Sequence, residues 1–181
     1  MMFKESYLKG AYIISLEKLE DERGFFARSF CKDEFRAAGL DMDVVQCNIS
    51  YNKKRGTLRG MHFQCAPYEE RKLVSCTRGS IFDVIIDLRK ESETYLEWEG
   101  FYLNQENHHM LYIPIGFAHG FCTLDDNSEV LYQMSEFYHP ECARGVRWDD
   151  PEFDIQWPAN ETYIVSSRDN NIGLWKDRIN G

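Results

Sequence analysis

The chain carries short apolar runs, each a few residues long, separated by turn signals. Runs rich in β-branched and aromatic residues are typical of strands. The run 81–88 alternates most clearly, because Phe82, Val84 and Ile86 fall on one face while Asp83 and Asp87 fall on the other. Arg-Gly pairs at 23–24, 55–56, 78–79 and 144–145 supply turns between runs. The pattern predicts strands over 44–50, 72–77, 81–88, 98–103, 110–113, 120–124 and 129–137.

Short strands at this regular spacing predict an all-β fold, arranged as a sandwich, jelly roll or barrel. One helix is expected over 33–40, where Asp33 can cap the first turn and Gly39 sits at the closing turn. A small helical segment is expected over 169–179. No repeat, low-complexity segment or linker interrupts the 181 residues, so we expect one domain over 1–181.

Composition and charge narrow the classes of partner. Aromatic residues make up 14% of the chain, which favours β structure. The net charge of −9 makes nucleic acid a poor partner, although a few local cations can still hold a small anionic ligand. The six cysteines form no C-x-x-C pair, and we interpret them as buried, reduced thiols.

The amino-terminal sequence lacks a sustained apolar stretch and a small-residue cleavage pattern. No run approaches the ~18 apolar residues that a membrane-spanning helix needs. We therefore expect a cytoplasmic protein with no membrane partner.

Three residues are candidates for proton transfer. His62 lies at the end of a probable strand in GTLRGMHFQ, and histidine is the natural base near neutral pH. Tyr132 in EVLYQMSEFYHP can act as a general acid, and Asp169 in SSRDNN can fix the tautomer of a histidine. Each also has an ordinary structural interpretation: a core histidine, a packed tyrosine and a solvated or capping aspartate.

Cations are sparse, and Arg23, Arg59, Lys72 and Arg168 stand out among them. Arginine suits phosphate, and a lysine at a strand start can face a developing oxyanion inside a barrel. His62 and His119 lie in segments like those that hold metal in cupin barrels, but two histidines without a third ligand make a poor site. We therefore expect no metal.

Motifs for nucleotide hydrolysis, dinucleotide binding and serine hydrolases are missing, since the sequence has no G-x-x-x-x-G-K-[ST], G-x-G-x-x-G or G-x-S-x-G run. The remaining chemistry is proton transfer without a bound cofactor.

Seven segments occur in an order that resembles one family. They are DERGFFARSF, QCNIS, GTLRGMHFQ, RKLVSCTRGSIFDVIIDLRKES, IPIGFAHGF, EVLYQMSEFYHP and RGVRWDDPEFDIQWP, from about Asp21 to Pro158, with a weaker match at 166–169. Together they resemble the dTDP-4-dehydrorhamnose 3,5-epimerase family, whose members are cupin-type jelly rolls. The resemblance implies a cofactor-independent epimerase that inverts carbon 3, carbon 5 or both in a nucleotide-linked 4-keto-6-deoxy sugar.

The resemblance also implies roles for individual residues. His62 matches the family base, Tyr132 the acid, Asp169 the carboxylate paired with the base, and Lys72 the cation near the keto oxygen. It further implies a homodimer whose amino-terminal segments reach the partner's site, with Arg23 and Phe26 as cross-subunit candidates. The substrate-binding positions it assigns are Arg23, Phe26, Gln46, Asn48, Arg59, His119, Tyr138 and Arg168.

Two departures bear on specificity, because the family often carries acidic residues where this chain has Arg28 and Ala143, both near the nucleotide. A CDP- or GDP-linked sugar is therefore an alternative to the dTDP-linked one. Three other functions remain open: a sugar-nucleotide 3,4-ketoisomerase, an inactive sugar-nucleotide binding module and a metal-dependent cupin dioxygenase.

Overall fold

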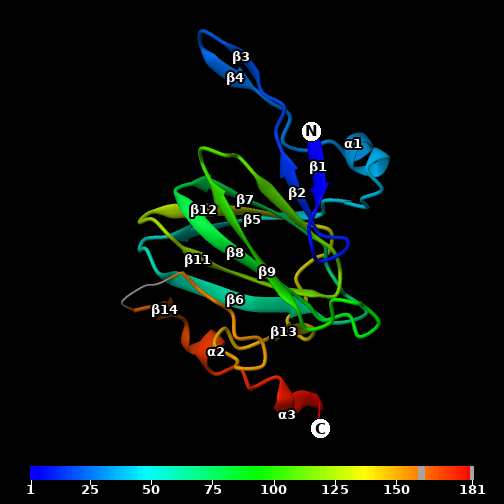
Figure 1. The fold of residues 1–181 in the computed structure, drawn as a ribbon, viewed down its shortest axis with the longest axis vertical. Coiled ribbons are helices and arrows are strands. Elements are labelled where there is room, and N and C mark those ends of the chain that lie inside the picture. The colour runs from blue at the N-terminus through cyan, green and yellow to red at the C-terminus, as the bar shows by residue number, and fades with distance from the viewer. Residues whose placement is uncertain (159–161, 180–181) are drawn as a thin grey trace.

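A computed structural model shows two six-stranded sheets packed face to face, and it describes residues 1–158 and 162–179 (Figure 1). The prediction of one domain over 1–181 includes 159–161 and 180–181, which lie outside the described residues. The predicted all-β sandwich is confirmed. In order across the first sheet lie β1 (Met2–Glu5), β2 (Tyr12–Ser15), β10 (Met110–Ile113), β7 (Lys72–Arg78), β12 (Ser128–Met134) and β5 (Gln46–Asn52).

The second sheet is built mainly from antiparallel pairs. Strand β14 (Ile164–Val165) pairs in parallel with β6 (Thr57–Gln64) and is an additional strand outside the linear order of the other five. That order is β13 (Ala143–Gly145), β6 (Thr57–Gln64), β11 (Phe117–Thr123), β8 (Ser80–Asp87) and β9 (Trp98–Asn104).

Strand β8 shows how the alternating pattern builds the core. Ile81 and Ile85 point between the sheets, into a cluster with Val74, Leu111 and Phe121. The opposite face of β8 is also buried, because the carboxy-terminal segment covers it. That second cluster contains Phe82, Val84, Ile86, Phe153, Trp157 and Trp175. Both faces of β8 are therefore excluded from water, which explains why nearly all of its residues are buried.

The helices differ from the sequence prediction in their details. Helix α1 (Lys32–Ala37) begins after Cys31, which makes no side-chain cap, so the prediction that Asp33 caps it is wrong. Asp33 lies in the first turn instead, where its negative charge interacts favourably with the positive end of the helix dipole. Gly39 adopts a φ of +76° directly after the helix, as its closing role requires.

The predicted helix over 169–179 is two short helices, α2 (Ser167–Asn170) and α3 (Lys176–Ile179). The prediction of a continuous helix is wrong because the chain between them is held elsewhere. The backbone N–H of Trp175 donates to Oδ2 of the buried Asp150 at 2.6 Å, and the Trp175 ring packs on Phe153.

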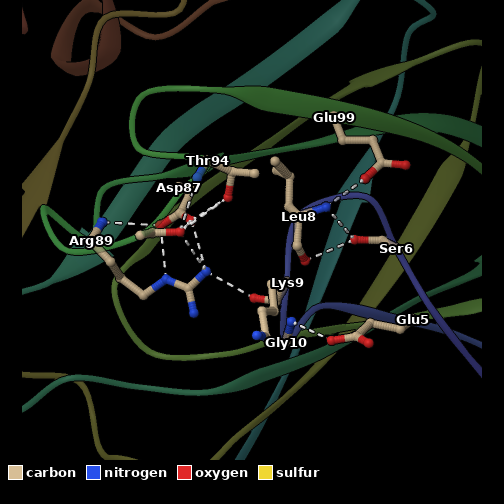
Figure 2. A network of polar contacts seen from close by, with 10 residues as sticks. Glu5, Ser6, Leu8, Lys9, Gly10, Asp87, Arg89, Thr94 and Glu99 are labelled. Atoms are coloured by element: carbon tan, nitrogen blue, oxygen red, sulfur yellow. Dashed lines mark hydrogen bonds and ion pairs between the residues drawn. The ribbon is translucent and has the colours of Figure 1, made fainter.

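A polar network links the β1–β2 turn to the loop after β8 (Figure 2). Asp87 is fully buried, and its two carboxylate oxygens accept from the Arg89 guanidinium at 2.8 and 2.7 Å. Ser92 and Thr94 also donate to Asp87, while Arg89 donates to the carbonyl of Lys9. The buried carboxylate is therefore paired and fully hydrogen-bonded, as such a group must be.

A short hairpin lies outside the sandwich. The hairpin of β3 (Leu19–Asp21) and β4 (Gly24–Phe26) extends away from one end of the sheets, opposite the end that carries α3 (Figure 1). Within the described part of the chain, no helix is long and apolar enough to cross a membrane.

The cysteine interpretation is correct for Cys76, Cys122 and Cys142, which are buried, and wrong for Cys47, which is exposed.

Candidate active site

A cavity of about 630 Å³ opens between the two sheets. Its walls come from β5, β7 and β12 of the first sheet, β6 and β11 of the second, and the segment containing α2. Ten of the twelve residues predicted for the site line it, although they are spread from position 46 to position 169. These residues are Gln46, Asn48, Arg59, His62, Lys72, His119, Tyr132, Tyr138, Arg168 and Asp169.

His62 and Asp169 form a hydrogen-bonded pair in this cavity. Nε2 of His62 lies 2.7 Å from Oδ1 of Asp169, whose side chain is 6% exposed. Asp169 lies in α2, and its backbone N–H donates to the capping Ser166 hydroxyl. Burial acts to raise the pKa of Asp169, but the hydrogen bonds from His62, the Gly60 N–H and Ser166 hold it below the ordinary value of 3.8. Asp169 is therefore a carboxylate at neutral pH, and it fixes the orientation of the His62 ring.

Gly60 allows strand β6 to approach its neighbour β11 closely. Its φ is +133°, and a Cβ there would lie 2.5 Å from the Cα of Gly120 on β11. The register between β6 and β11 shifts at this point, next to the pairing of His119 with His62. The irregularity brings both histidines to the cavity while the Gly60 N–H reaches Oδ2 of Asp169 at 3.5 Å.

A second histidine–carboxylate pair lies deeper in the structure. Nε2 of His119 lies 2.7 Å from Oδ1 of Asp83, and both side chains are buried. The His119 ring meets the Tyr132 ring edge to face, with centroids 5.9 Å apart. Burial, followed by the nearby charge of Asp83, raises the pKa of Tyr132 far above its ordinary value. The phenol of Tyr132 therefore keeps its proton across the neutral range.

Lys72 extends into the cavity from the first residue of β7. Its Nζ lies 2.9 Å from Oε1 of Glu70 and 3.4 Å from the carbonyl oxygen of His62. The Lys72 and Glu70 side chains are 10% and 9% exposed, so this ion pair is almost wholly inside the protein. Sequence reasoning missed Glu70. The signal available was its position two residues before Lys72, since such residues share a face on an extended chain.

Several of the remaining cavity residues carry polar or aromatic groups. Arg59 donates through Nε to Oδ1 of the buried Asn52 at 2.7 Å. Oε1 of Gln46 accepts from the backbone N–H of Tyr138 at 3.4 Å, and the Tyr138 side chain is largely exposed. The Asn48 amide reaches only a sulfur atom, Sδ of Met134 at 3.8 Å. The Asn48 amide is therefore still able to take a stronger acceptor.

Arg23 and Phe26 lie away from the cavity of their own chain, on the projecting hairpin (Figure 1). Arg23 is 84% exposed and bonds to Asp21. Of the two positions that depart from the family pattern, Ala143 lines the cavity, whereas Arg28 lies outside it and pairs with Glu34.

Among residues 1–158 and 162–179, no group of three or more His, Cys, Asp or Glu side chains is arranged to hold a metal ion. His62 and His119 each have a carboxylate partner on Nε2.

Comparisons with known proteins identify the family and agree with the fold. A family model described as dTDP-4-dehydrorhamnose 3,5-epimerase matches residues 5–177. The enzyme of that name from Methanothermobacter thermautotrophicus is 46% identical over 176 residues, covering 96% of this chain and 92% of the relative. The similarity therefore extends over most of both sequences.

Two crystal structures of similar proteins share the fold. The structure of the dTDP-4-dehydrorhamnose 3,5-epimerase of Bacillus anthracis, with TDP and PPi bound, matches this chain with a TM-score of 0.92. The two sequences are 39% identical, and the match covers 96% of this chain and 98% of the Bacillus anthracis chain. The structure of the dTDP-6-deoxy-D-glucose-3,5-epimerase of Legionella pneumophila, in complex with dTDP-4-keto-L-rhamnose, matches with a TM-score of 0.90. The two sequences are 35% identical, and the match covers 96% of this chain and 92% of the Legionella pneumophila chain. The predicted cupin-type jelly roll is confirmed, and the chain belongs to the dTDP-4-dehydrorhamnose 3,5-epimerase family, a family of isomerases.

Proposed function

We propose that this protein is a cofactor-independent epimerase that converts dTDP-4-dehydro-6-deoxyglucose to dTDP-4-dehydrorhamnose. One observation carries the proposal: His62, oriented by Asp169, and Tyr132 line the same cavity from opposite sheets. A base and an acid on opposite walls suit a reaction that removes a proton from one face of a sugar ring and returns one to the other.

The hydrogen bond to Asp169 assigns the atoms of the base. Because the ionised carboxylate accepts from Nε2 of His62, that nitrogen carries a proton and Nδ1 holds the lone pair. The ketone at carbon 4 acidifies the hydrogens at carbons 3 and 5. Nδ1 takes one of these protons and leaves an enolate, whose oxygen faces the Lys72 ammonium.

Inversion is completed when the Tyr132 hydroxyl gives its proton to the carbon from the opposite face. This leaves an imidazolium and a phenolate, which return to their starting states by exchanging protons with solvent. Stabilisation of the enolate oxygen by Lys72 is worth about 3–4 kcal/mol, on the scale of other oxyanion donors.

The other cavity residues suit the remainder of a nucleotide sugar. Arg59 offers a guanidinium to the diphosphate, and Tyr138 offers an exposed ring on which a base can stack. Gln46, Asn48 and His119 supply polar contacts to the sugar, and Arg168 adds positive charge beside Asp169. The thymidine nucleotide is proposed because the Bacillus anthracis relative was solved with TDP and the Legionella pneumophila relative with a dTDP-linked sugar.

We also propose a homodimer in which the β3–β4 hairpin of one subunit reaches the cavity of the other. Leu19 and Phe26 on the hairpin are 70% and 73% exposed, which leaves large apolar side chains for a partner to cover. On the edge strand β5, Ile49, which lines the cavity, and Tyr51 are also exposed. In such a dimer Arg23 and Phe26 complete the partner's site.

The experiment is incubation with dTDP-, CDP- and GDP-linked 4-keto-6-deoxy sugars in heavy water, followed by proton NMR. Deuterium at carbons 3 and 5 with formation of the rhamno configuration from the dTDP sugar supports the proposal. Turnover of only a CDP- or GDP-linked sugar would reject the nucleotide, and movement of the keto group to carbon 3 would indicate a ketoisomerase. Binding without any exchange would indicate an inactive binding module.

A further inference from the structure

We infer that Glu70 is a positioning residue for the Lys72 ammonium, holding it aimed so that one N–H remains for the substrate's keto oxygen. The inference deepens the proposed function and rests on it. The feature that carries it is an ion pair of two nearly buried side chains, Nζ to Oε1 at 2.9 Å, on the wall of the cavity.

The local chain geometry explains why the two groups meet. Residues two apart on an extended chain project to the same face, so Glu70, Lys72 and Val74 all point inward. Val74 lies in the core between the sheets, and Leu73 points the other way, into the cluster around α1. Glu70 therefore reaches the cavity from the segment just before β7.

The donors of the ammonium can be counted. A lysine ammonium has three N–H groups and no acceptor. Here one is directed at Oε1 of Glu70 and a second at the carbonyl oxygen of His62, 3.4 Å away. Those two partners leave one N–H, and they fix a side chain that otherwise has four rotatable bonds. The carbonyl belongs to the residue proposed as the base, so the same contact ties the oxyanion-binding group to the base.

The charge of Glu70 matters as well as its hydrogen bond. A buried ammonium without a partner is unfavourable, and a carboxylate at 2.9 Å offsets the cost of removing it from water. The resting pair has no net charge. When the enolate forms, its oxygen becomes a second anionic partner for an ammonium that is already in place, so little reorganisation is needed.

A double-mutant cycle tests whether Glu70 acts through Lys72. We expect Glu70→Ala to lower kcat for deuterium exchange about 10- to 100-fold with KM changed less than twofold, because the ammonium acts mainly on charge that develops during the reaction. Glu70→Asp should recover part of the loss. Glu69→Ala, an exposed neighbouring carboxylate, is the matched control and should leave kcat unchanged.

In the background of Lys72→Met, the change Glu70→Ala should have almost no further effect on kcat, because the group it positions is gone. Equal losses from Glu70→Ala with and without Lys72 would overturn the inference and indicate a purely structural role. Thermal unfolding of each variant shows whether a loss of kcat accompanies a loss of folding.

A second measurement does not depend on turnover. In protein labelled with ¹³C and ¹⁵N at lysine, the Lys72 ammonium signal is assigned by its loss in Lys72→Met. It should shift or broaden in Glu70→Ala and stay in place in Glu69→Ala. An unmoved signal in Glu70→Ala overturns the inference. If the wild-type protein exchanges no substrate while this signal moves, the proposed function fails and the positioning role stands.

Discussion

His62 and Asp169 lie 107 positions apart in the chain, yet Nε2 of one is 2.7 Å from Oδ1 of the other. Two local structures create this contact. Strand β6 carries the histidine into the cavity, and the single turn of α2, capped by Ser166, carries the buried aspartate to meet it. Asp169 makes no other side-chain ion pair among the described residues, so a substitution that removes its charge removes an ion-pair partner from His62 alone.

Asp169→Asn should reduce kcat for exchange at carbons 3 and 5 by about 10²- to 10⁴-fold, as in other enzymes where a histidine loses its orienting carboxylate. The amide no longer stabilises the imidazolium, and it can hold the ring in the wrong tautomer. The measurement is deuterium incorporation by NMR, with Asp33→Asn, a highly exposed aspartate, as the control. Exchange at the wild-type rate in Asp169→Asn would reject the pair as the base.

Tyr132→Phe should separate exchange from inversion. In the proposed mechanism the phenol supplies the proton on the face opposite His62, and burial raises its pKa, which keeps it protonated. Without it, abstraction and return on the same face continue, so deuterium still enters the substrate while the inverted product forms more than about 10²-fold more slowly. Product configuration is read from proton coupling constants. Loss of binding with unchanged inversion per bound substrate would contradict the acid role.

Asp87 should make the free energy of unfolding depend on pH in the acid range. Burial acts to raise its pKa, but hydrogen bonds from Arg89, Ser92 and Thr94 bring it below the ordinary 3.8. A lowered pKa in the folded state means that the stabilisation is present above pH 3.8 and is lost as the pH falls through the folded value. Asp87→Asn should therefore cost on the order of 2–3 kcal/mol near neutral pH.

The difference between wild type and Asp87→Asn should shrink steadily as the pH drops below about 4 and through the lowered pKa of folded Asp87, because the carboxylate is then protonated and neutral like the amide. Urea unfolding across this range measures it. Asp126→Asn is a matched control, since Asp126 also has a pKa lowered by hydrogen bonds but lies on the surface, and its effect should be much smaller. A difference for Asp87→Asn that does not change with pH would contradict the argument.

Gly60→Ala should destabilise the protein by about 3 kcal/mol or more, because backbone strain and overpacking add. The new Cβ would meet the Gly120 backbone at 2.5 Å with φ at +133°. Gly39→Ala is the control, because Gly39 also has a positive φ but has open space around its Cβ, so it incurs strain alone, about 1 kcal/mol. Urea unfolding compares the two, and equal losses would show that the contact with Gly120 is unimportant.

Strands such as β8 could be predicted from the sequence because they are rich in β-branched and aromatic residues. Strands β1 to β4, β13 and β14 were missed. They are only two to four residues long, and β3 and β4 are exposed throughout, so these strands have too few buried positions to set an alternating pattern. The C-terminal helix was overextended for a related reason, since the contact of Trp175 with Asp150 depends on the fold.

The candidate site was predicted largely through family resemblance, since each residue alone had an ordinary structural interpretation. Ten of its twelve residues share the cavity because inward-facing positions of two sheets converge there, which no local pattern reveals. Glu70 was overlooked because it precedes β7 in a run of charged residues and looks like its exposed neighbour Glu69. Its burial becomes apparent only when the strand places Lys72 inside.

Arg23 provides a test of whether the site is shared between subunits. If the β3–β4 hairpin serves the partner's cavity, then a subunit with His62→Ala can still lend its Arg23, and a subunit with Arg23→Ala can still supply His62. Each variant alone should have low activity. After the two are unfolded and refolded together in equal amounts, half of the dimers are mixed and each has one intact site, so about a quarter of wild-type activity should return.

If instead each hairpin acts on its own cavity, every site in the mixture carries one defect and no activity returns. Arg55→Ala, which alters an exposed arginine outside the cavity, controls for the refolding step. Light scattering on the wild-type protein gives the independent measurement, since a monomer in solution would exclude any exchange of hairpins. Restored activity at the expected level requires both an assembled dimer and a trans contribution from Arg23, because neither parent variant has an intact site by itself.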